Sequence, residues 1–592
     1  MSTNHSIYLR AATCAALLSL ASAATPATPS PQNSYLVHNL VSDLPDTADF
    51  QDPNLVNPWG IATTATSPFW IGNNGSGTST LYGTTGTAVA LVVTIPTTAG
   101  PTGGAVSGTI ANTTTSFSIA DGKPASFIFC TEDGTISGWN GTVSPAGAAT
   151  ISVDNTKANS VFKGCVIGGT AAAPILYVTD FHNGVVDMFD GNFKPIAAAT
   201  AFTDPSIPAG YAPFGIANFS GKIYVTYAKQ DSAKHDDVSG AGNGYVDVFD
   251  GSGNLVTQLI SKGLLNSPWG MQIAPATFGQ FSGALLVANF GDGTINAFDA
   301  AKGTPLGTLN DSTHHTLSIP GLWGLLFGNG GRGGDTSTLY FTAGFPGPYG
   351  EGAESHGIFG SIQAPPSFTP AGVINGASFL PPLAPNTWAT VVGGGLAASS
   401  RSWASTDLVG GSLPSVIDGV SVSVNGVPAE ISFVGPSQVD FLIPATAAVG
   451  AAQIQVISNE QVSAPATVNL TLTAPAFFWL TGNKYIVSTH ANGTVTGPTT
   501  LIPGATTPVK AGETIALYGT GFTVNTPGVG AAALPSVTIG GVTATVTFAG
   551  QIDAGITQIN VVVPATVPSG DAAVVATMGG QQSQANAFIS IQ

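Results

Sequence analysis

Hydrophobic and polar residues alternate in short runs along most of the chain, and turn residues separate the runs. The stretch from Leu176 to Gly191 contains an apolar strand, the pair Asn183-Gly184 and a second strand that ends in Phe-Asp-Gly. Asn-Gly between apolar runs predicts a hairpin, because both residues tolerate the positive φ of a tight turn. The pattern returns almost position for position from Ala284 to Asp299, and its second half returns from Gly242 to Gly251. With no long stretch of helical period, the pattern predicts an all-β chain built on a repeated hairpin.

A second repeated marker is an aromatic-Gly pair that opens an apolar strand. It occurs clearly four times and in weaker form twice, at Trp59-Gly60, Phe214-Gly215, Trp269-Gly270, Trp323-Gly324, Pro124 to Phe127 and Lys163-Gly164. Repeats of roughly 40 to 50 residues with several strands each are typical of β-propellers. We therefore predict a six-bladed β-propeller over residues 24–364. We expect His356 to Gly360 to pair with Ser34 to Val37 and so close the ring.

The pattern changes beyond Ile362, where Pro365-Pro366 and Pro370 indicate a linker. The stretch from Val422 to Val456 then resembles that from Val537 to Ala576, each with a strand, a tight turn and further strands at similar spacing. Strands and turns at this spacing are typical of small β-sandwiches. We predict two Ig-like β-sandwich domains, at residues 365–472 and 473–592.

Composition narrows the classes of partner. The formal net charge is −17, and the 592 residues include only 14 Lys and Arg. Binding to a nucleic-acid backbone requires clustered Lys and Arg, so nucleic acid and anionic membrane surfaces are poor candidates. A low-charge, acidic chain rich in Thr and Ser instead favours an exported protein.

The N-terminal residues predict export directly. Arg10 precedes a short apolar run, Ala11 to Ala21, and Ala21-Ser22-Ala23 has the form of a cleavage site. This predicts a signal peptide over residues 1–23, cleaved near Ala23, and a secreted, periplasmic or cell-surface protein. No later apolar run is long enough for a transmembrane helix.

Two cysteines, Cys130 and Cys165, lie in neighbouring repeats of the predicted propeller. In an oxidising compartment they could form one disulfide. The alternative is that both are small buried hydrophobic residues.

Longer motifs resemble known families. Asn57 to Ala62, Asp180 to Gly184, Tyr227 to Asp231 and Ala288 to Gly293 resemble a family of uncharacterised secreted bacterial proteins. The repeat is also similar to the NHL-like blades of six-bladed propellers. The tail resembles an uncharacterised C-terminal domain of secreted proteins from soil bacteria, present here twice. The resemblance implies a fold but no activity.

The first candidate site is the mouth of the predicted channel. Turns and strand ends on one face of a propeller converge there, and a pocket lined by polar groups is the usual ligand site. The residues expected there are Asn73, Asn74, Glu132, Asp133, Asp180, His182, Asn183, Asn289 and Asp292, with Asp180 and His182 the strongest. The alternative is structural, because Asn, Asp and Gly are also the residues that tight turns require.

The second candidate is the long insertion from Lys229 to Gly244, where sister repeats have a short turn. It carries dense charge and could offer imidazole and carboxylate ligands to a divalent cation such as Ca²⁺, although no calcium-loop motif is present. Its candidate ligand-binding residues are Lys229, Asp231, His235, Asp236 and Asp237. A solvated surface loop is the alternative. Two further polar residues are Glu354 and His356, and His356 lies at the expected closing strand, where a structural histidine is the more ordinary outcome.

Two classes of function follow. The first is a secreted or cell-surface binding or scaffold protein, whose propeller face binds a polymer, glycan or small molecule and whose tail domains act as spacers or attachment modules. The second is an extracellular metal-dependent hydrolase acting at the channel mouth. The sequence contains no Gly-x-Ser-x-Gly, His-Glu-x-x-His, phosphate-loop or Cys-x-x-Cys motif, which favours binding over catalysis.

Overall fold

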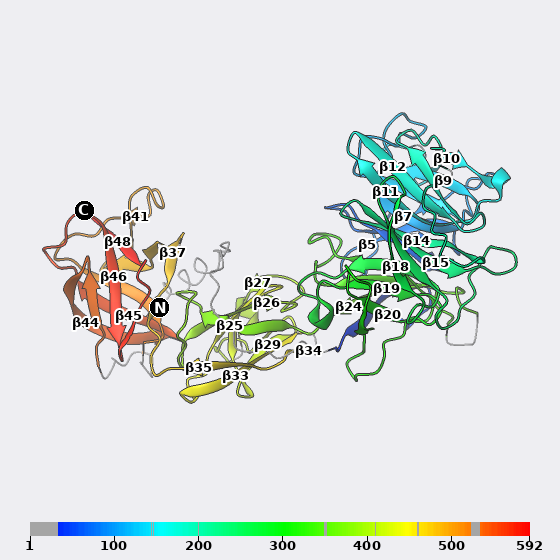
Figure 1. The fold of residues 1–592 in the computed structure, drawn as a ribbon. Coiled ribbons are helices and arrows are strands. Elements are labelled where there is room, and N and C mark those ends of the chain that lie inside the picture. Colours follow the sequence, from blue (N-terminus) through cyan, green and yellow to red (C-terminus); the bar gives the residue numbers. More distant parts are fainter. Residues whose placement is uncertain are drawn as a thin grey trace. The chain divides into compact units, whose positions relative to one another are not determined.

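The computed structural model describes residues 33–592 apart from 144, 146, 199, 348–351, 409, 459–460, 483 and 523–532. The predicted signal peptide therefore lies outside the described residues. Gln32–Ala364 forms one compact unit and Pro365–Gln592 belongs to another (Figure 1). The chain is all-β, and the helices of its described part are the short 3-10 turns η1 (Thr156–Ala158), η2 (Gly279–Phe281) and η3 (Ser405–Asp407). None of the described helices combines the length and the apolar character needed to cross a membrane.

The first unit contains six sheets within its described residues, and nearly all of their strand pairs are antiparallel. In chain order their strands are β1 (Leu36–Ser42) and β2 (Phe50–Gln51), which join the last sheet; β3 (Pro58–Ala62), β4 (Phe69–Asn73), β5 (Thr78–Tyr82) and β6 (Val93–Thr94); β7 (Val106–Ala111), β8 (Phe127–Thr131), β9 (Thr135–Trp139) and β10 (Thr150–Asp154); β11 (Phe162–Thr170), β12 (Ala173–Asp180) and β13 (Val185–Asp190); β14 (Tyr211–Phe219), β15 (Lys222–Lys229), β16 (Tyr245–Phe249) and β17 (Leu255–Ser261); β18 (Pro268–Ile273), β19 (Leu285–Asn289), β20 (Ile295–Phe298) and β21 (Pro305–Thr308); and β22 (Leu322–Phe327), β23 (Leu339–Ala343) and β24 (Ile358–Gln363).

The first strands of the sheets contact one another in a closed sequence. β3 contacts β7, β7 contacts β11, and the contacts continue through β14 and β18 to β22, which contacts β3. The unit is therefore propeller-like, with β3, β7, β11, β14, β18 and β22 as its inner strands. The last sheet combines both ends of the unit, because β1 pairs with β24.

This pairing was predicted, and the structure shifts its register. Val37 lies opposite Ile362, and Gly360 lies opposite Asn39. His356 precedes the strand, and its Nδ1 lies 2.7 Å from Oδ2 of Asp43. His356 thus holds the loop that leads into β24, as expected for a structural histidine.

The aromatic-Gly pairs lie on inner strands, and their glycines allow neighbouring sheets to approach closely. A Cβ atom on Gly215 would lie 2.1 Å from the carbonyl oxygen of Trp269, and one on Gly270 would lie 2.4 Å from that of Trp323. Contacts this short exclude a side chain at either glycine. The pair thus serves packing, because the glycine contacts the next sheet and the aromatic ring lies in the centre of the unit.

Threonine hydroxyls connect neighbouring sheets at the same level. The Thr226 hydroxyl accepts the amide of Gly215 at 2.7 Å and donates to the carbonyl of Pro268 at 2.6 Å. The Thr342 hydroxyl likewise accepts from Gly324 at 2.9 Å and donates to Trp59 at 2.5 Å. Each bond satisfies buried backbone groups that the bulged inner strand leaves outside its own ladder.

One predicted strand start was misplaced. Pro124 to Phe127 leads into β8, the second strand of its sheet, and the inner strand is β7, which lies upstream. Ser107-Gly108 occupies the position of the aromatic-Gly pair, and the Ser107 hydroxyl donates to the carbonyl oxygen of Phe162 at 2.5 Å in the next sheet. Because serine replaces the aromatic residue, the marker was not recognised in the sequence.

The second unit contains two hydrophobic cores, one within residues 373–470 and one within residues 477–591. The two similar stretches of sequence form matching strands, because β29 pairs with β33 in the first core and β43 pairs with β46 in the second. Trp388 links the two halves, since its backbone amide donates to the hydroxyl of Thr520 at 3.0 Å and its indole nitrogen donates to the carbonyl of Ala554 at 2.9 Å.

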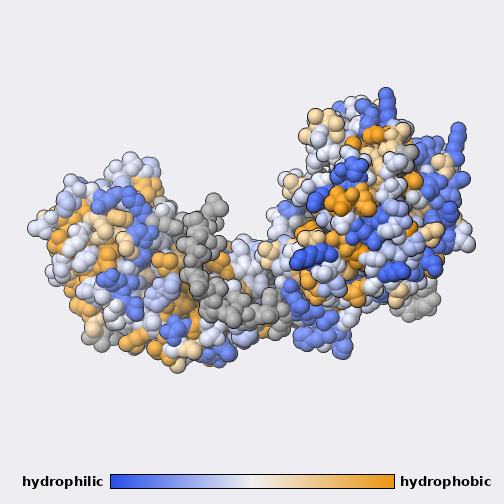
Figure 2. Space-filling view, in the orientation of Figure 1, coloured by the Kyte–Doolittle hydropathy of each residue, from blue (hydrophilic) through white to orange (hydrophobic). Residues whose placement is uncertain are grey.

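The strands of this unit that contain four or more residues are β25 (Ser367–Asn375), β26 (Trp388–Gly394), β29 (Val420–Val424), β31 (Glu430–Gly435), β32 (Gln438–Leu442), β33 (Gly450–Ser458), β35 (Ala466–Leu470), β42 (Thr514–Thr520), β43 (Ser536–Ile539), β44 (Val542–Asp553), β45 (Ile556–Val562), β46 (Gly570–Met578) and β48 (Phe588–Ile591). Shorter strands complete the sheets at β27 (Arg401–Ser402), β28 (Val416–Ile417), β30 (Val427–Pro428), β34 (Gln461–Val462), β36 (Ala476–Phe477), β37 (Trp479–Thr481), β38 (Tyr485–Ile486), β39 (Ser488–His490), β40 (Val495–Thr496), β41 (Thr506–Thr507) and β47 (Gln581–Gln582). On the visible face of both units, hydrophobic residues are scattered among hydrophilic ones (Figure 2).

Candidate functional site

Aromatic rings fill the centre of the first unit. Trp59, Phe181, Phe214 and Trp323 are buried there, and Trp269 and Phe290 pack against them. Phe290 stacks on Trp323 with ring centroids 4.0 Å apart. Most of these rings come from inner strands, so the repeated aromatic-Gly pairs produce a packed apolar centre rather than an open channel.

Lys163 interrupts this aromatic set. It occupies the aromatic position of the pair Lys163-Gly164 on β11, and its side chain is only 1% exposed. Its ammonium nitrogen lies 5.0 Å from the ring centroid of Trp59 and 5.8 Å from that of Phe181. A buried ammonium requires compensating negative charge. Two carboxylates supply it: Glu132 forms a direct ion pair with Lys163, and Asp236 lies 3.5 Å away.

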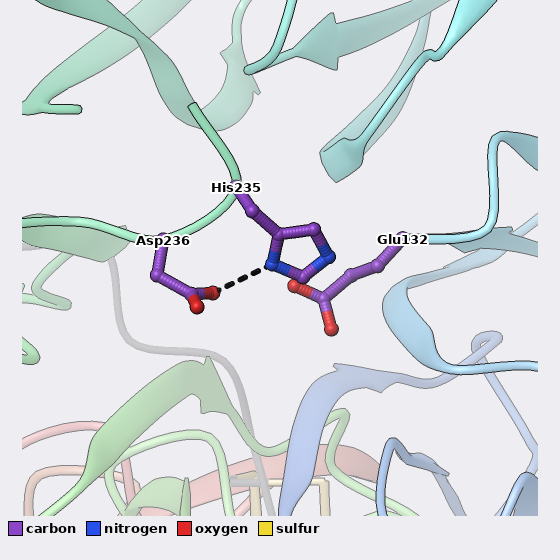
Figure 3. A group of neighbouring side chains, drawn as sticks. All are labelled: Glu132, His235 and Asp236. Carbon is purple, nitrogen blue, oxygen red and sulfur yellow. Dashed lines mark hydrogen bonds and ion pairs between the residues drawn. The ribbon is translucent and has the colours of Figure 1, made fainter. Parts of the chain in front are cut away.

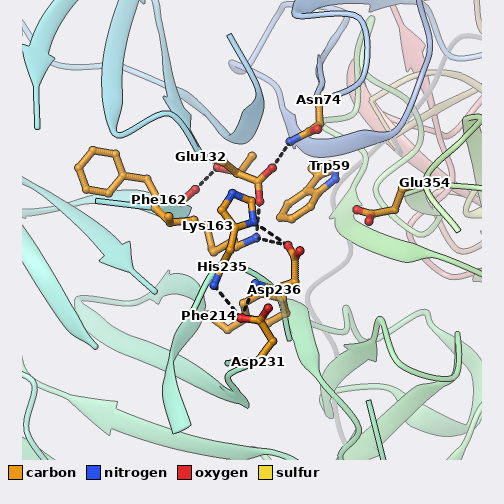
Figure 4. Close-up of polar contacts among 12 residues, drawn as sticks. Trp59, Asn74, Glu132, Phe162, Lys163, Phe214, Asp231, His235, Asp236 and Glu354 are labelled. Atoms are coloured by element: carbon orange, nitrogen blue, oxygen red, sulfur yellow. Dashed lines mark hydrogen bonds and ion pairs between the residues drawn. The ribbon is translucent and has the colours of Figure 1, made fainter. Parts of the chain in front are cut away.

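Glu132 follows β8 and lies at the rim above the aromatic rings. Its side chain is 11% exposed, and its Oε2 accepts a hydrogen bond from the amide of Asn74 at 2.7 Å. Asn74 follows β4 in the preceding sheet. Glu132 thus connects side chains from three consecutive sheets (Figure 4).

The insertion after β15 brings Asp236 and His235 to the same place. Residues 229–238 fold as a small hairpin, in which the amide of Val238 donates to the carbonyl of Lys229 at 2.8 Å. The carboxylate of Asp231 accepts the amide of His235 at 2.9 Å and fixes the turn. The tip carries His235, whose Nδ1 lies 2.9 Å from Oδ1 of Asp236. Figure 3 shows the imidazole ring between Asp236 and Glu132.

Glu354 extends the network on the opposite side. Its Oε1 accepts from the side-chain amide of Asn57 at 3.2 Å, and the same amide lies 3.4 Å from Oδ1 of Asn74. Burial raises the pKa of Glu354 to about 7. The hydrogen bond from Asn57 and the charge of Lys163 oppose this change, whereas the charges of Glu132 and Asp236 add to it. Glu354 can therefore gain or lose a proton near neutral pH.

Three residues of the site could act as metal ligands. One ligand atom from each of Glu132, His235 and Asp236 can be chosen so that all three lie within 4.8 Å of one another. His235 and Asp236 are exposed, with side chains 47% and 67% accessible, so the group opens to solvent.

Several predicted site residues have structural roles instead. The Asp180 carboxylate is 1% exposed and accepts the amides of Val161 and Asn183, each at 3.2 Å. Asn289 accepts the amide of Asn266 at 3.1 Å, and Asp292 accepts the Asn266 side chain at 3.0 Å. These groups hold turns together, which was the alternative reading of this set.

The remaining predicted site residues differ in their exposure and in the hydrogen bonds that their side chains form. His182 is half-buried, and the described contacts include no hydrogen bond from its side chain. Asp133 accepts the amide of Ala105 at 2.7 Å, and Asn73 donates to Thr78 and Thr80. Lys229 is exposed. Asp237 is half-buried next to the site, and burial raises its pKa, which the Ser267 hydroxyl and Lys163 counteract.

Lys163, Asn57 and Glu354 were not predicted as site residues. For Lys163 the sequence did contain a signal, because it is the one cation at a position that four other repeats fill with tryptophan or phenylalanine. Asn57 and Glu354 had no such signal, since only ring closure brings the first and last sheets together.

Cys130 and Cys165 are free, buried thiols. Burial is the largest cause of a raised pKa of the Cys130 thiol, and its hydrogen bond with Cys165 raises the pKa further. The two residues therefore lie side by side without the disulfide that the sequence left possible, as in the alternative of two buried hydrophobic residues.

A cavity of about 640 Å³ lies away from this site, along β1 and the loop that follows it. It is lined by Val37, His38, Asn39 and residues 46–49. The pair His38 and Asp49, 2.9 Å apart, is about half exposed.

Comparison with known proteins identifies relatives without an assigned activity. No family model matches the chain. Among solved structures, the chain is similar to "Streptogramin B lyase structure", at 10% identity and a TM-score of 0.34, over 56% of this chain and 98% of that one. It is also similar to "Crystal structure of RRP9 WD40 repeats", at 9% identity and a TM-score of 0.30, over 57% and 100% of the two chains.

Two curated relatives come from Acanthamoeba polyphaga mimivirus. The chain is 33% identical to "Uncharacterized protein R648" over 304 residues, which cover 49% of this chain and 73% of that protein. It is 32% identical to "Uncharacterized protein L690" over 324 residues, which cover 52% and 82%. The chain therefore belongs to the family of these two uncharacterized viral proteins.

Proposed function

We propose that the first unit is a six-bladed β-propeller that binds a small polar molecule or glycan at the rim above its packed aromatic centre, where the sequence predicts the channel mouth. The six sheets and the closed sequence of contacts among their inner strands support the six-bladed arrangement. β1, supplied from the N-terminal end, completes the sheet of β22–β24 and so joins the two ends of the ring.

One observation carries the binding proposal. Lys163 is buried among aromatic rings, and it is held by carboxylates that come from two other sheets, Glu132 and Asp236. Burying a charge in this position lowers the stability of the fold, whereas an apolar residue would complete the aromatic set. This cost favours a functional role for Lys163. Charged groups converging at an open rim are suited to orienting a polar ligand.

A binding array of glycans and small polar molecules tests the proposal with the full chain. The double variant Glu132→Gln, Asp236→Asn should lose at least about tenfold in affinity for any compound that the unchanged protein binds. The matched control is Asp299→Asn, which alters a half-buried turn carboxylate directly after β20 and should leave binding unchanged. Binding that is equal in all three proteins would place the ligand elsewhere and reject the channel-mouth site.

A hydrolase acting at the same mouth is the second candidate, and Glu354 favours it. A carboxyl group with a pKa of about 7 can exchange a proton with a substrate near neutral pH. A panel of chromogenic esters and glycosides would test this activity, with Glu354→Gln as the variant expected to lose it. Hydrolysis that survives this substitution would rule out Glu354 as the proton carrier.

We further propose that the two cores of the second unit are Ig-like sandwiches that serve as spacers or attachment modules, and that the protein is exported after cleavage near Ala23. The shared strand pairing of the two repeats supports the first proposal. N-terminal sequencing of the protein from its native source tests the second, and an intact Met1 would reject it.

A further inference from the structure

The rim of the first unit combines two carboxylates and an imidazole around a single buried cation. Glu132 and Asp236 both interact with Lys163, and both also belong to the triplet with His235 whose ligand atoms fit within 4.8 Å. The ammonium group of Lys163 therefore occupies the charge position that a metal ion would take between these carboxylates.

We infer that Glu132, His235 and Asp236 form a binding site for a divalent transition metal such as Zn²⁺, and that Lys163 is a built-in competitor for it. This inference rests on the site of the proposed function and names an ion that the site would hold. Three side chains leave further coordination positions open to water or to a ligand, as in exchangeable metal sites.

The donor set distinguishes among metals. Ca²⁺ requires six to eight oxygen ligands, whereas this group offers two carboxylates and one ring nitrogen. Imidazole together with carboxylate is suited to zinc and its neighbours in the first transition row. Nδ1 of His235 and Oδ1 of Asp236 lie 2.9 Å apart, so an ion bound by both atoms would replace their present contact. The expected ion is thus not the Ca²⁺ considered from the sequence.

Competition follows from charge and position. A metal ion and the Lys163 ammonium cannot both occupy the space between Glu132 and Asp236, so metal binding must displace the ammonium or remove its proton. The ammonium already lies 5.0 Å from the Trp59 ring centroid and 5.8 Å from that of Phe181, and these ring faces can continue to stabilise it when the carboxylates bind a metal ion. The unchanged protein should therefore bind the metal weakly, and removal of the Lys163 charge should strengthen binding.

Titration of the full chain with Zn²⁺ by calorimetry, and with Co²⁺ by visible absorption, tests the inference. Lys163→Met keeps an unbranched chain that suits the aromatic surroundings and removes the positive charge. This variant should bind one ion per chain at least about tenfold more tightly than the unchanged protein. The control Lys222→Met removes an exposed lysine at the start of β15 and should bind as the unchanged protein does.

The double variant Lys163→Met, His235→Gln should bind the ion about 100-fold more weakly than Lys163→Met does, and it should lack the Co²⁺ absorption band. Circular dichroism of each variant checks that it has folded. The inference is overturned if folded Lys163→Met binds Zn²⁺ no more tightly than the unchanged protein, or if His235→Gln leaves that binding intact. Loss of array binding in the Glu132 and Asp236 variant, without any metal effect, would overturn this inference alone and leave the proposed function standing.

Discussion

Trp59 and Trp323 stack on each other in the centre of the first unit, with ring centroids 3.6 Å apart and planes inclined by 19°. They lie on the first and last inner strands, β3 and β22. The hydroxyl of Thr342 joins the same two strands, because it accepts from Gly324 and donates to the carbonyl of Trp59. The ring is thus closed at its centre as well as by the outer pairing of β1 with β24.

Thr342→Val should lower the free energy of unfolding by about 2 to 3 kcal/mol. The substitution keeps the shape of the side chain but leaves a buried amide and a buried carbonyl without their partner. Urea unfolding followed by tryptophan fluorescence measures the change. Thr342→Ser should retain most of the stability, and Thr257→Val, at an exposed position on β17, should be neutral. A loss equal in Thr342→Ser and Thr342→Val would show that packing of the methyl group matters instead of the hydroxyl.

Asp247 should make the protein less stable as the pH rises. Its side chain is fully buried on β16. Burial is the main reason that its pKa is raised to about 7, and the nearby charge of Asp204 adds to this effect. Because this value lies above that of an unfolded chain, the stabilising contribution is complete below about pH 4 and is lost as the pH rises through about 7. Asp247→Asn should remove this dependence and raise stability at pH 8 by about 2 kcal/mol. The corresponding position on β20 is an asparagine, Asn296, so a side-chain amide is already accommodated at this position in another sheet of the unit.

Urea unfolding of both proteins at several values between pH 4 and pH 8 provides the measurement. Parallel profiles for the unchanged protein and for Asp247→Asn would mean that Asp247 is ionised in the folded state across this range.

Cys130 and Cys165 should resist thiol reagents in the native protein and react in denaturant. Both are buried, and the raised pKa of Cys130 keeps the less reactive thiol form. The test is to count thiols with a chromogenic disulfide reagent before and after unfolding without reductant. If neither residue is labelled after unfolding until a reductant is added, the native protein contains the disulfide that the structure lacks.

Glu354 should titrate near pH 7, and Lys163→Met should move its midpoint to a higher pH. The Lys163 charge favours the ionised carboxylate, so removing it leaves the opposing effects of burial and of Glu132 and Asp236. Carboxyl infrared bands, assigned by comparison with Glu354→Gln, report the midpoint. An unchanged or lower midpoint in Lys163→Met would show that Lys163 does not act on Glu354.

The sequence by itself determined the repeated hairpins, the all-β class and the change of pattern near Pro365. These features depend on local rules: alternation predicts strands, Asn-Gly predicts tight turns, and glycine is required where neighbouring sheets approach closely. A local rule also explains why the pattern does not identify β7, since serine at position 107 replaces the aromatic residue of the pair.

Only the tertiary structure decided which polar residues share a site. Asp180 and Asn289 lie at turns, as the sequence predicts, but their side-chain oxygens accept hydrogen bonds from backbone amides. The sequence alone does not show whether such an oxygen is bonded to the backbone or is available to a ligand. Lys163 lies on β11, whereas Glu132 and Asp236 lie in loops of the two flanking sheets, and the packing of these three consecutive sheets brings the side chains together. A buried charge requires partners of opposite charge, so the position of Lys163 among aromatic rings determines which carboxylates form this site. The spacing of these residues along the chain does not predict that they meet.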